Sequence, residues 1–382
     1  MAKPGVDKRA NKIIRMKIII GIARFIIGVL FIFSGLIKAN DPLGLSYKMQ
    51  EFFEVWNLPQ FNNYTLTLSV IMIAFEIIAG VAVLIGWKMR LFSWLLLLLI
   101  LFFTFLTGYA LFSGKIRECG CFGDCIPLQA NQSFIKDVIL LFLILLIMPF
   151  RDWIKPSIGG GTAKIILFFT VVFSFAFQWY VLQHLPIVDC LPYKVGNNIP
   201  AKMKVPPGAV PDSTVIMFTY EKNGKQFSFT TENFPADFDD SYKFVKREDK
   251  VVRKGTAVPA IRDFSLQTTS GNDTTQALLT EQGTKIFLFL KDGYKPDEWI
   301  PKMDMIISAA AKKNIKGFLV TNLDIPADHE GFLGGLITLK TDGTAIKTAA
   351  RYNPTLFLIR NGTILKKWSA ADFDAALRYI AK

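Results

Sequence analysis

Three of the four cysteines in this 382-residue chain lie in one short run, Cys119-Gly120-Cys121-Phe122-Gly123-Asp124-Cys125, and the fourth is Cys190. Thiols this close in sequence are typical of disulfide exchange, of a structural disulfide, or of a site for zinc or Cu(I). Close cysteines need a tight backbone, which the interspersed glycines permit. Four cysteines allow three complete pairings, so the spacing alone leaves both connectivity and chemistry open.

The charged neighbours of the cluster bear on whether it can react as a thiolate. Lys115 and Arg117 favour the thiolate, which is the attacking species in disulfide exchange. Glu118 and Asp124 oppose them. A bond between the first two cysteines of the cluster would close a strained ring that is easily reduced. A bond to the third would be less strained, and Cys190 could resolve either.

A metal site would depend on the same four thiols. Of the two histidines, His184 is the only one near the cluster, and we expect it at the membrane interface. His329 stands alone and is expected on the surface. We predict no metal. The candidate catalytic residues are the four cysteines: Cys119, Cys121, Cys125 and Cys190.

The composition indicates a membrane protein. Hydrophobic residues make up 51% of the chain and the mean hydropathy is +0.35, which is too apolar for an ordinary soluble protein. The apolar residues concentrate in the first half, in five runs that we expect to cross a bilayer. The predicted spans are 18–37, 66–87, 91–112, 138–150 and 165–182. The fourth is short, and it extends back to Phe134 if Lys136 and Asp137 lie in the headgroup region. A further stretch, 47–56, fits either an amphipathic interfacial helix or a polar loop.

Basic residues predict how these spans are oriented. The chain has a net charge of +13, and its N-terminal tail is basic, as are the turn at 88–90 and the linker at 151–164. The positive-inside rule places these segments in the cytoplasm. A basic tail could also bind nucleic acid, but a tail directly before an apolar run is explained by orientation, and we predict no nucleic-acid partner.

The cysteines should therefore face the oxidising side, where disulfides persist. Two predicted spans lie between Cys125 and Cys190, so all four cysteines share one compartment whatever the orientation. We predict a multi-pass protein of the bacterial inner membrane, in contact with the lipid bilayer, with a cytoplasmic N-terminus and a periplasmic C-terminal domain.

The presence of two ionisable residues within the spans needs an explanation, because placing a charge in lipid costs free energy. Arg24 lies in the first span and Glu76 in the second. We expect them to pair with each other or with backbone groups inside the bundle, and a proton relay is the alternative. Both are expected nearer the cytoplasmic end than the cysteines, which argues against a direct part in thiol chemistry.

The second half alternates between strand and helix patterns. Within 184–256, apolar alternation at 214–220 and 226–231 flanks an Asn223-Gly224 turn, which predicts a β-hairpin. From 257 onward the pattern predicts a mixed α/β sheet domain. Its expected elements are a strand, turn and return strand at 263–273, strands at 285–290 and 316–321, a hairpin at 353–365, and helices at 297–312 and 370–380.

Residues 257–382 resemble a thioredoxin fold. The strand after Pro354 and its Asn361-Gly362 turn resemble the cis-proline hairpin of that fold. The Asp263-Phe264 stretch resembles the opening hairpin of the peroxiredoxin-like branch. In the family the active cysteines follow the strand that corresponds to 285–290, and here that place has no cysteine. The resemblance implies a domain without thiol catalysis that can bind an extended peptide beside Pro354.

Residues 15–155 resemble the DoxX/MauE group of membrane proteins. The resemblance rests on Ser34-Gly35-Leu36-Ile37-Lys38 followed by Asp41-Pro42, on Glu76 with Gly80, and above all on the Cys119–Gly123 run. It implies a helical bundle similar to quinone-coupled disulfide-generating membrane proteins. It also implies disulfide formation or thiol delivery that supports the maturation of periplasmic enzymes.

Together these features predict a membrane α-helical bundle of about five spans with a C-terminal α/β thioredoxin-like domain. The expected divisions are a tail (1–17), a bundle (18–155) with the cysteine loop (113–133), a fifth helix (156–183), a β-containing segment (184–256) and the thioredoxin-like domain (257–382). The predicted activity is thiol-disulfide exchange with a periplasmic thiol or client protein, with quinone as the candidate electron acceptor. The alternative is a non-catalytic membrane scaffold that docks partners and uses its disulfides structurally.

Overall fold

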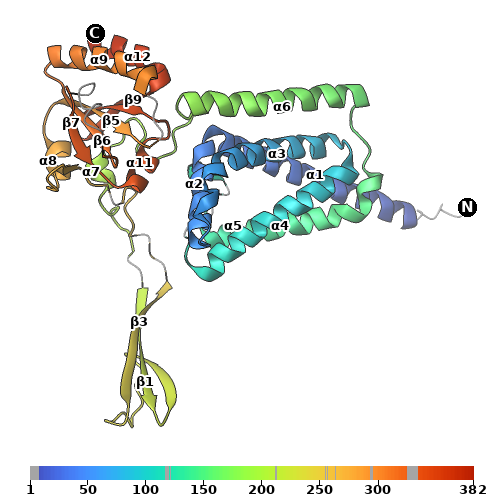
Figure 1. Ribbon diagram of the computed structural model, residues 1–382. Coiled ribbons are helices and arrows are strands. Elements are labelled where there is room, and N and C mark those ends of the chain that lie inside the picture. The colour runs from blue at the N-terminus through green and yellow to red at the C-terminus, as the bar shows by residue number, and fades with distance from the viewer. Residues whose placement is uncertain are drawn as a thin grey trace, which may run out of the picture.

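A computed structural model of the chain describes residues 8–116, 120, 122–210, 213–253, 255, 257–262, 264–292, 296–324 and 334–382. Among these residues, five helices are long and apolar enough to cross a membrane, as the sequence predicts. They are α1 (Lys8–Asn40), α3 (Thr65–Ile85), α4 (Met89–Ser113), α5 (Ala130–Ile147) and α6 (Gly160–Gln183). In Figure 1 they run side by side. Helix α1 begins at the end of the bundle far from the second half of the chain, residues 184–382, which we call the soluble half.

Small residues let α1 and α3 pack closely. A Cβ atom on Gly80 would lie 2.9 Å from the carbonyl oxygen of Gly28, so the two backbones nearly touch there. Ile27 and Ala79, beside these glycines, are fully buried. Small residues at such a crossing are typical of helices that associate within a membrane. This close pair brings the end of α1 opposite the middle of α3.

A short helix, α2 (Pro42–Val55), follows α1 and crosses the end of the bundle in Figure 1. Of the two interpretations for this stretch, the helix is therefore correct. Asp41 caps it by accepting a hydrogen bond from the Gly44 amide at 3.1 Å. On its apolar face, Phe52 is buried against Trp56 and Tyr109. The helix thus lies between the bundle and the soluble half.

A three-stranded antiparallel sheet projects from the soluble half in Figure 1. It consists of β1 (Ser213–Lys222), β2 (Lys225–Thr230) and β3 (Lys243–Arg253), in the order β2-β1-β3. Asn223 and Gly224 connect the first two strands with φ angles of 52° and 72°. Positive φ at both central residues is what a tight hairpin turn requires, so the predicted hairpin is confirmed.

The C-terminal domain is built on a mixed six-stranded sheet with the order β4-β7-β6-β5-β8-β9. Its strands are β4 (Gln267–Thr268), β5 (Thr284–Leu290), β6 (Lys316–Thr321), β7 (Ile337–Lys340), β8 (Thr355–Arg360) and β9 (Thr363–Ser369). Its helices include α7 (Ile199–Lys202), α8 (Thr275–Thr280), α9 (Pro296–Lys312), α11 (Gly343–Ala349) and α12 (Phe373–Ala381). Strands β5, β6 and β7 are parallel, and β8 is antiparallel to β5. The predicted α/β fold class is confirmed.

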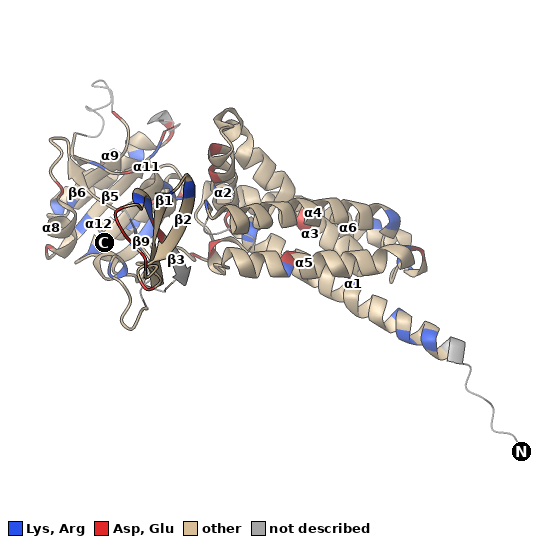
Figure 2. Ribbon diagram, turned by 90° about the horizontal axis from the view of Figure 1, so that it is seen from below, with Lys and Arg blue, Asp and Glu red and all other residues tan. Residues whose placement is uncertain are grey.

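Strand β5 separates two hydrophobic cores because its side chains alternate between the faces of the sheet. Phe287 and Phe289 pack on the face that α11 covers. Ile286 and Leu288 pack on the opposite face, against α9 and α12. The strand is therefore buried on both sides, as a continuous apolar run predicts. Figure 2 shows that charged residues are spread over this domain, whereas the long helices carry few away from their ends.

Two parts of this domain differ from the expectation. The predicted strand, turn and return strand at 263–273 are shorter than expected: the described residues there contain the two-residue β4, a turn and one antiparallel bridge between Gln267 and Asp273, and Asp263 lies outside them. The Leu266 carbonyl accepts from the Thr274 N–H at 2.8 Å, and the Thr275 hydroxyl accepts from the Leu266 amide at 2.7 Å. The sequence analysis also missed β7 and α11, which are too short for a clear periodic pattern.

Candidate functional site

Cys125 and Cys190 form a disulfide that joins the cysteine loop to the segment after α6. The sequence had left the pairing open, with Cys190 as a resolving partner. The bond also confirms that these two cysteines lie on the same side of the bundle. The other two candidate catalytic residues, Cys119 and Cys121, lie outside the described residues, and their part in catalysis stays a prediction.

Local backbone geometry brings the two bonded cysteines together. Cys125 ends a short 3-10 turn, η2 (Gly123–Cys125), in which Gly123 has a φ of 56° that favours glycine. On the other side, the side chain of Asn40 holds the segment that leads to Cys190. Its amide accepts from the Val188 N–H at 3.0 Å and donates to the Val188 carbonyl at 2.8 Å. The end of α1 therefore anchors this segment beside the cysteine loop.

A buried ion pair lies inside the bundle. Lys38 Nζ donates to both carboxylate oxygens of Glu76, at 2.7 and 2.8 Å, and the two side chains are 2% and 3% exposed. The Ser34 hydroxyl donates to the same carboxylate at 3.3 Å. We call Ser34, Lys38 and Glu76 the bundle site. A carboxylate in this position needs such a partner, because an unpaired buried charge is costly.

The predicted pairing of Arg24 with Glu76 is wrong. Arg24 lies about 21 Å along the helix from Lys38, at about 1.5 Å per residue, so it cannot reach the same carboxylate. Instead it donates to the Ser157 hydroxyl at 3.2 Å, in the linker between α5 and α6. The expectation that Glu76 lies away from the cysteine loop is also wrong, because Glu76 and Phe122 line the same pocket.

A second buried carboxylate lies near the bundle site. Asp137 on α5 is fully buried, although the sequence analysis had assigned it to the headgroup region. The Thr107 hydroxyl donates to it at 3.1 Å, and Lys136 Nζ also donates to it. The same ammonium lies 5.2 Å from the ring centre of Phe122 in the cysteine loop. Charged groups of the bundle thus reach up to the loop itself.

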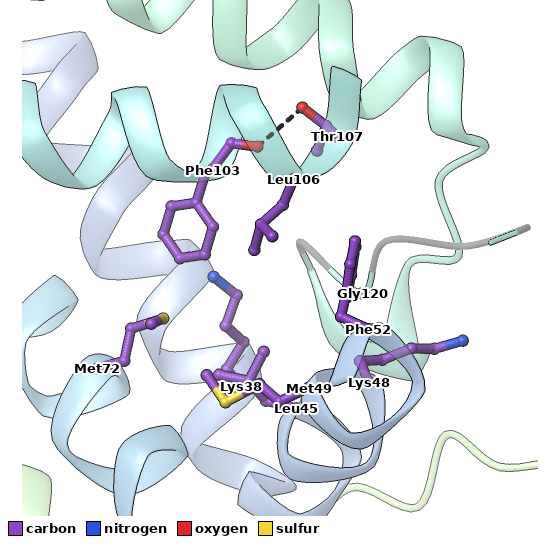
Figure 3. A pocket seen from close by; sticks show the side chains of 10 residues that line it. All are labelled: Lys38, Leu45, Lys48, Met49, Phe52, Met72, Phe103, Leu106, Thr107 and Gly120. Atoms are coloured by element: carbon purple, nitrogen blue, oxygen red, sulfur yellow. Dashed lines mark hydrogen bonds between the residues drawn. The ribbon is translucent and has the colours of Figure 1, made fainter. Parts of the chain in front are cut away.

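Two pockets meet at Lys38. The first is a small cavity of about 20 Å³, and its lining includes Lys38, Met49, Met72, Phe103 and Gly120. The second, of about 10 Å³, also includes Lys38 and Phe103. Figure 3 shows Lys38 reaching toward the Phe103 ring, with Nζ 4.5 Å from its centre. Mostly apolar walls with a few polar groups are typical of small-molecule sites. Gly120, between the two undescribed cysteines, forms part of the wall.

The thioredoxin-like domain docks against the cysteine loop through Arg351, which precedes β8. Its Nε donates to Asp41 at 2.7 Å, and its Nη2 donates to Asp124, the neighbour of Cys125. The Arg351 side chain is only 8% exposed. We call Arg351, Asp41 and Asp124 the interface site. Paired charges of this kind fix the register between two surfaces.

Tyr47 on α2 supports this contact. Three cations surround its ring, with Arg351 and Lys347 each 5.5 Å and Lys291 5.7 Å from the centre. Lys291 follows β5, and its Nζ donates to the Tyr47 hydroxyl at 3.1 Å. Burial, with Arg351 nearby, lowers the pKa of Lys291 to about 7. Burial raises the pKa of Tyr47 to about 12, so the phenol stays neutral.

Pro354, the predicted peptide-binding residue, is buried and follows a cis peptide bond with Asn353. The Asn353 side chain accepts from the Lys291 amide at 2.8 Å and donates to the Lys291 carbonyl at 3.0 Å. Peptide binding beside Pro354 stays a prediction. The loop directly before it, however, already contacts the membrane half through Arg351.

The described residues contain no group of three or more His, Cys, Asp and Glu side chains arranged to hold a metal. His184 ends α6, where its Nδ1 lies 3.0 Å from an Asp372 oxygen. His329 lies outside the described residues. Two of the four cysteines are joined to each other, and thiols in a disulfide are not thiolate ligands.

Sequence reasoning missed Lys38, Asp137 and Arg351. The first could have been found, because it continues the helix of the first span four residues after Ser34. Asp137 could have been placed inside the bundle if the fourth span had been started at Ala130. Nothing in the sequence near Arg351 signals its partners, which lie more than two hundred residues away.

Comparisons with known proteins match separate parts of the chain. Residues 16–150 match the family model for methylamine utilisation protein MauE, and residues 214–254 match a domain of unknown function (DUF8463). A search of curated proteins found no match.

Three solved structures are similar to the soluble half, each over 31% of this chain. Xanthomonas campestris peroxiredoxin Q is 15% identical, with a TM-score of 0.25 and 90% of its own chain covered. A thioredoxin-like protein from Bacteroides caccae is 20% identical, with a TM-score of 0.24 and 46% covered. The Xanthomonas campestris bacterioferritin comigratory protein is 18% identical, with a TM-score of 0.24 and 93% covered. The DoxX part of the predicted resemblance stays a prediction, whereas the MauE part is confirmed by the match of the family model to residues 16–150.

Proposed function

We propose that this protein is a thiol-disulfide oxidoreductase of the bacterial inner membrane, with its cysteine loop and thioredoxin-like domain in the periplasm. The observation that carries the proposal is the position of the cysteine loop. A disulfide holds its end at Cys125, and Gly120 forms the wall of the pocket around Lys38. These contacts support a site in which the loop thiols act beside a pocket between the membrane helices.

In the proposed reaction, Cys119 and Cys121 are the exchanging pair. A client thiolate attacks their disulfide, one loop sulfur leaves as a thiolate, and the second client thiol then displaces the other loop sulfur. The client dithiol becomes a disulfide, and the loop pair becomes two thiols. Two electrons and two protons must then leave the loop before another turnover. Cys125 and Cys190 hold the loop in place while its pair is exchanged.

The chemistry of the residues around Lys38 suits an aromatic carbonyl compound such as a quinone, for which the cavity of about 20 Å³ would have to widen. Its walls are largely apolar, and an ammonium has three donors, of which Lys38 uses two on Glu76. A bound quinone would supply the acceptor for the two electrons and two protons. Lys38 would orient a carbonyl oxygen, while Phe103 and Met72 would exclude water.

The test is thiol trapping in intact membranes together with oxidation of a reduced dithiol peptide. An impermeant maleimide is applied before and after mild reduction, and mass spectrometry maps all four cysteines. We expect a mixed redox state of Cys119 and Cys121 that shifts with added quinone. Cys119→Ser and Cys121→Ser should each abolish peptide oxidation. A fully oxidised pattern that resists mild reduction, or labelling from the cytoplasmic side, would contradict the proposal.

The contacts of Arg351 favour a second candidate, a membrane scaffold whose soluble half docks partners. In that case the cysteines would only stabilise the fold. Serine at Cys119 and Cys121 would then leave peptide oxidation at the background rate. Any loss would be one of stability, about 2–4 kcal/mol for a native disulfide.

A further inference from the structure

Each cysteine of the Cys125–Cys190 disulfide directly follows an aspartate that pairs with a cation of the thioredoxin-like domain. Before Cys125, Asp124 accepts from Arg351. Before Cys190, Asp189 accepts from Lys367 Nζ at 2.8 Å. The two halves of one disulfide are thus held by two ion pairs to the same domain.

The cation of each ion pair is shielded from water, whereas its carboxylate is partly exposed. The Arg351 and Lys367 side chains are 8% and 6% exposed, and those of Asp124 and Asp189 are 30% and 24% exposed. Lys367 also lies over the Phe357 ring, with Nζ 4.9 Å from its centre. Attraction between charges is stronger beside a buried cation than in solvent, and removing the carboxylate would leave the cation buried without this partner. These contacts therefore hold their segments more firmly than exposed ion pairs would.

The two cations are also fixed relative to each other. Arg351 precedes β8, whereas Lys367 lies on β9, and the two strands pair directly, with Phe357 opposite Lys367. The Arg351 side chain is held in addition by the Lys347 carbonyl, which accepts from Nη1 at 2.8 Å. The β8–β9 hairpin and the loop before it therefore hold Arg351 and Lys367 at a fixed distance from each other.

We infer that the thioredoxin-like domain clamps the Cys125–Cys190 disulfide, with Arg351 and Lys367 as its positioning residues. After reduction, the clamp keeps both thiols close to each other and so raises their effective concentration. The oxidised form is therefore favoured while the domain is docked. By linkage, the disulfide must strengthen docking by the same factor by which docking strengthens the disulfide.

This inference assigns the thiol-free domain a part in the redox site. Any effect of the clamp on catalysis rests on the proposed function, because catalysis is affected only if the loop that ends at Cys125 exchanges disulfides. The coupling itself needs no client and no quinone. Its failure and the failure of the proposed function are therefore distinguishable by separate measurements.

The experiment measures the equilibrium of this one disulfide in the full-length chain in detergent. Cys119 and Cys121 are replaced by serine so that only the pair of interest reacts. Dithiothreitol at set ratios of dithiol to cyclic disulfide is the redox partner. It gives two electrons and two protons to the bond and becomes oxidised. Alkylation and mass spectrometry then quantify the reduced fraction of Cys125 and Cys190.

We expect Arg351→Ala and Lys367→Met each to make the disulfide about tenfold easier to reduce, a shift of about 30 mV. The matched control is Lys302→Met, which breaks an exposed ion pair with Asp374 in the same domain and should cause no shift. Arg351→Lys should give an intermediate value, because it keeps the charge but loses the planar fork. Unchanged potentials in both Arg351→Ala and Lys367→Met would overturn the inference.

Two further measurements separate a clamp from other effects. A purely electrostatic effect on the thiols would shift the potential in opposite directions in Arg351→Ala and Asp124→Asn. A clamp shifts both in the same direction, and the double variant shifts little further. If Arg351→Ala does not fold, hydrogen exchange of residues 347–353 in the chain with native Arg351 decides. Faster exchange after reduction supports the coupling, and identical exchange in both redox states contradicts it.

Discussion

Two buried charge clusters lie on either side of the cysteine loop, and they differ in what surrounds them. The bundle site, around Lys38 and Glu76, lies between membrane helices and opens into two pockets. The interface site, around Arg351, lies between the two halves of the molecule. Both exclude water, and both touch residues of the cysteine loop or its pockets.

The two clusters differ in how many protein groups bind the cation of each. Lys38 Nζ donates two hydrogen bonds to Glu76 and lines the cavity beside Phe103. Arg351 bonds Asp41, Asp124 and the Lys347 carbonyl, and it stacks on Tyr47. A cation beside a pocket suits ligand binding, whereas a cation surrounded by protein partners suits docking. Four predictions test this contrast, in order of decreasing effect.

The largest effect is expected at the bundle site. Lys38→Met leaves Glu76 buried without its ion-pair partner, and we expect a loss of about 3–5 kcal/mol in the free energy of unfolding. Thermal unfolding in detergent measures it. The control is the double variant Lys38→Met/Glu76→Leu, which removes both charges and should recover most of the stability while dithiol oxidation stays absent. Full oxidation activity in the double variant would contradict a ligand-binding Lys38.

The disulfide that lies between the two clusters comes next. Cys190→Ser removes a cross-link between residues 65 apart in sequence. Freeing such a loop in the unfolded chain costs about 2–4 kcal/mol of stability. We expect a lower thermal midpoint and a free thiol at Cys125. A midpoint equal to that of the unaltered chain under oxidising conditions would show that the helices alone hold the loop.

At the interface site, the Tyr47 ring can be tested apart from the ion pairs. Tyr47→Leu removes contacts with three cations, and we expect docking to weaken by about 2 kcal/mol. Hydrogen exchange of residues 347–353 reports this loss. Tyr47→Phe keeps the ring and removes only the hydroxyl, so it should have the smaller effect. Equal effects of the two variants would assign the stabilisation to the hydroxyl instead of the ring.

The smallest effect is a pH dependence of docking. Burial lowers the pKa of Lys291 to about 7 in the docked state, and undocking, which removes Tyr47 from its ammonium, should raise that pKa toward the ordinary value, so above pH 7 the undocked state binds more protons. Docking should therefore strengthen as pH rises through 7, by about 1 kcal/mol between pH 6 and 8. The charged groups facing Lys291 are Arg351, Lys347 and Asp41, and Tyr47 stays neutral in this range.

Hydrogen exchange of residues 347–353, corrected for the intrinsic effect of pH, measures this dependence. Lys291→Met should flatten it, because no proton is then exchanged on docking at that position. A dependence of the opposite sign, or one that persists in Lys291→Met, would assign the titration to another group. The bundle site has no counterpart to this test, since its lysine lies within the membrane-spanning part.

Features set by local pattern could be predicted. The five spans follow from apolar runs of membrane length, and the Asn223-Gly224 hairpin follows from the conformation its turn requires. The short β7 could not, because four residues carry too little periodicity. Arg24 and Glu76 were paired wrongly because the sequence of a span shows that a charge lies within it. It does not show whether charges on two different spans lie at the same depth in the bundle.

The candidate site divides in the same way. The cysteine motif marked the loop that we propose to be reactive, and an even number of crossings placed Cys190 on the same side as Cys125. The actual bond depends on Asn40 holding the segment before Cys190. The contribution of Lys38 was missed because the predicted first span ended at residue 37, whereas α1 continues to Asn40.

The sequence by itself determined the two halves of this protein, the five spans, the longer helices and strands, and the absence of cysteines from the C-terminal domain. These features depend on composition and on spacing within a few turns of chain. Only the tertiary structure decided that Lys38 pairs with Glu76 and that Arg351 bridges Asp41 and Asp124. Such contacts join residues far apart in sequence, and their energies exist only once packing has removed water from around the charges.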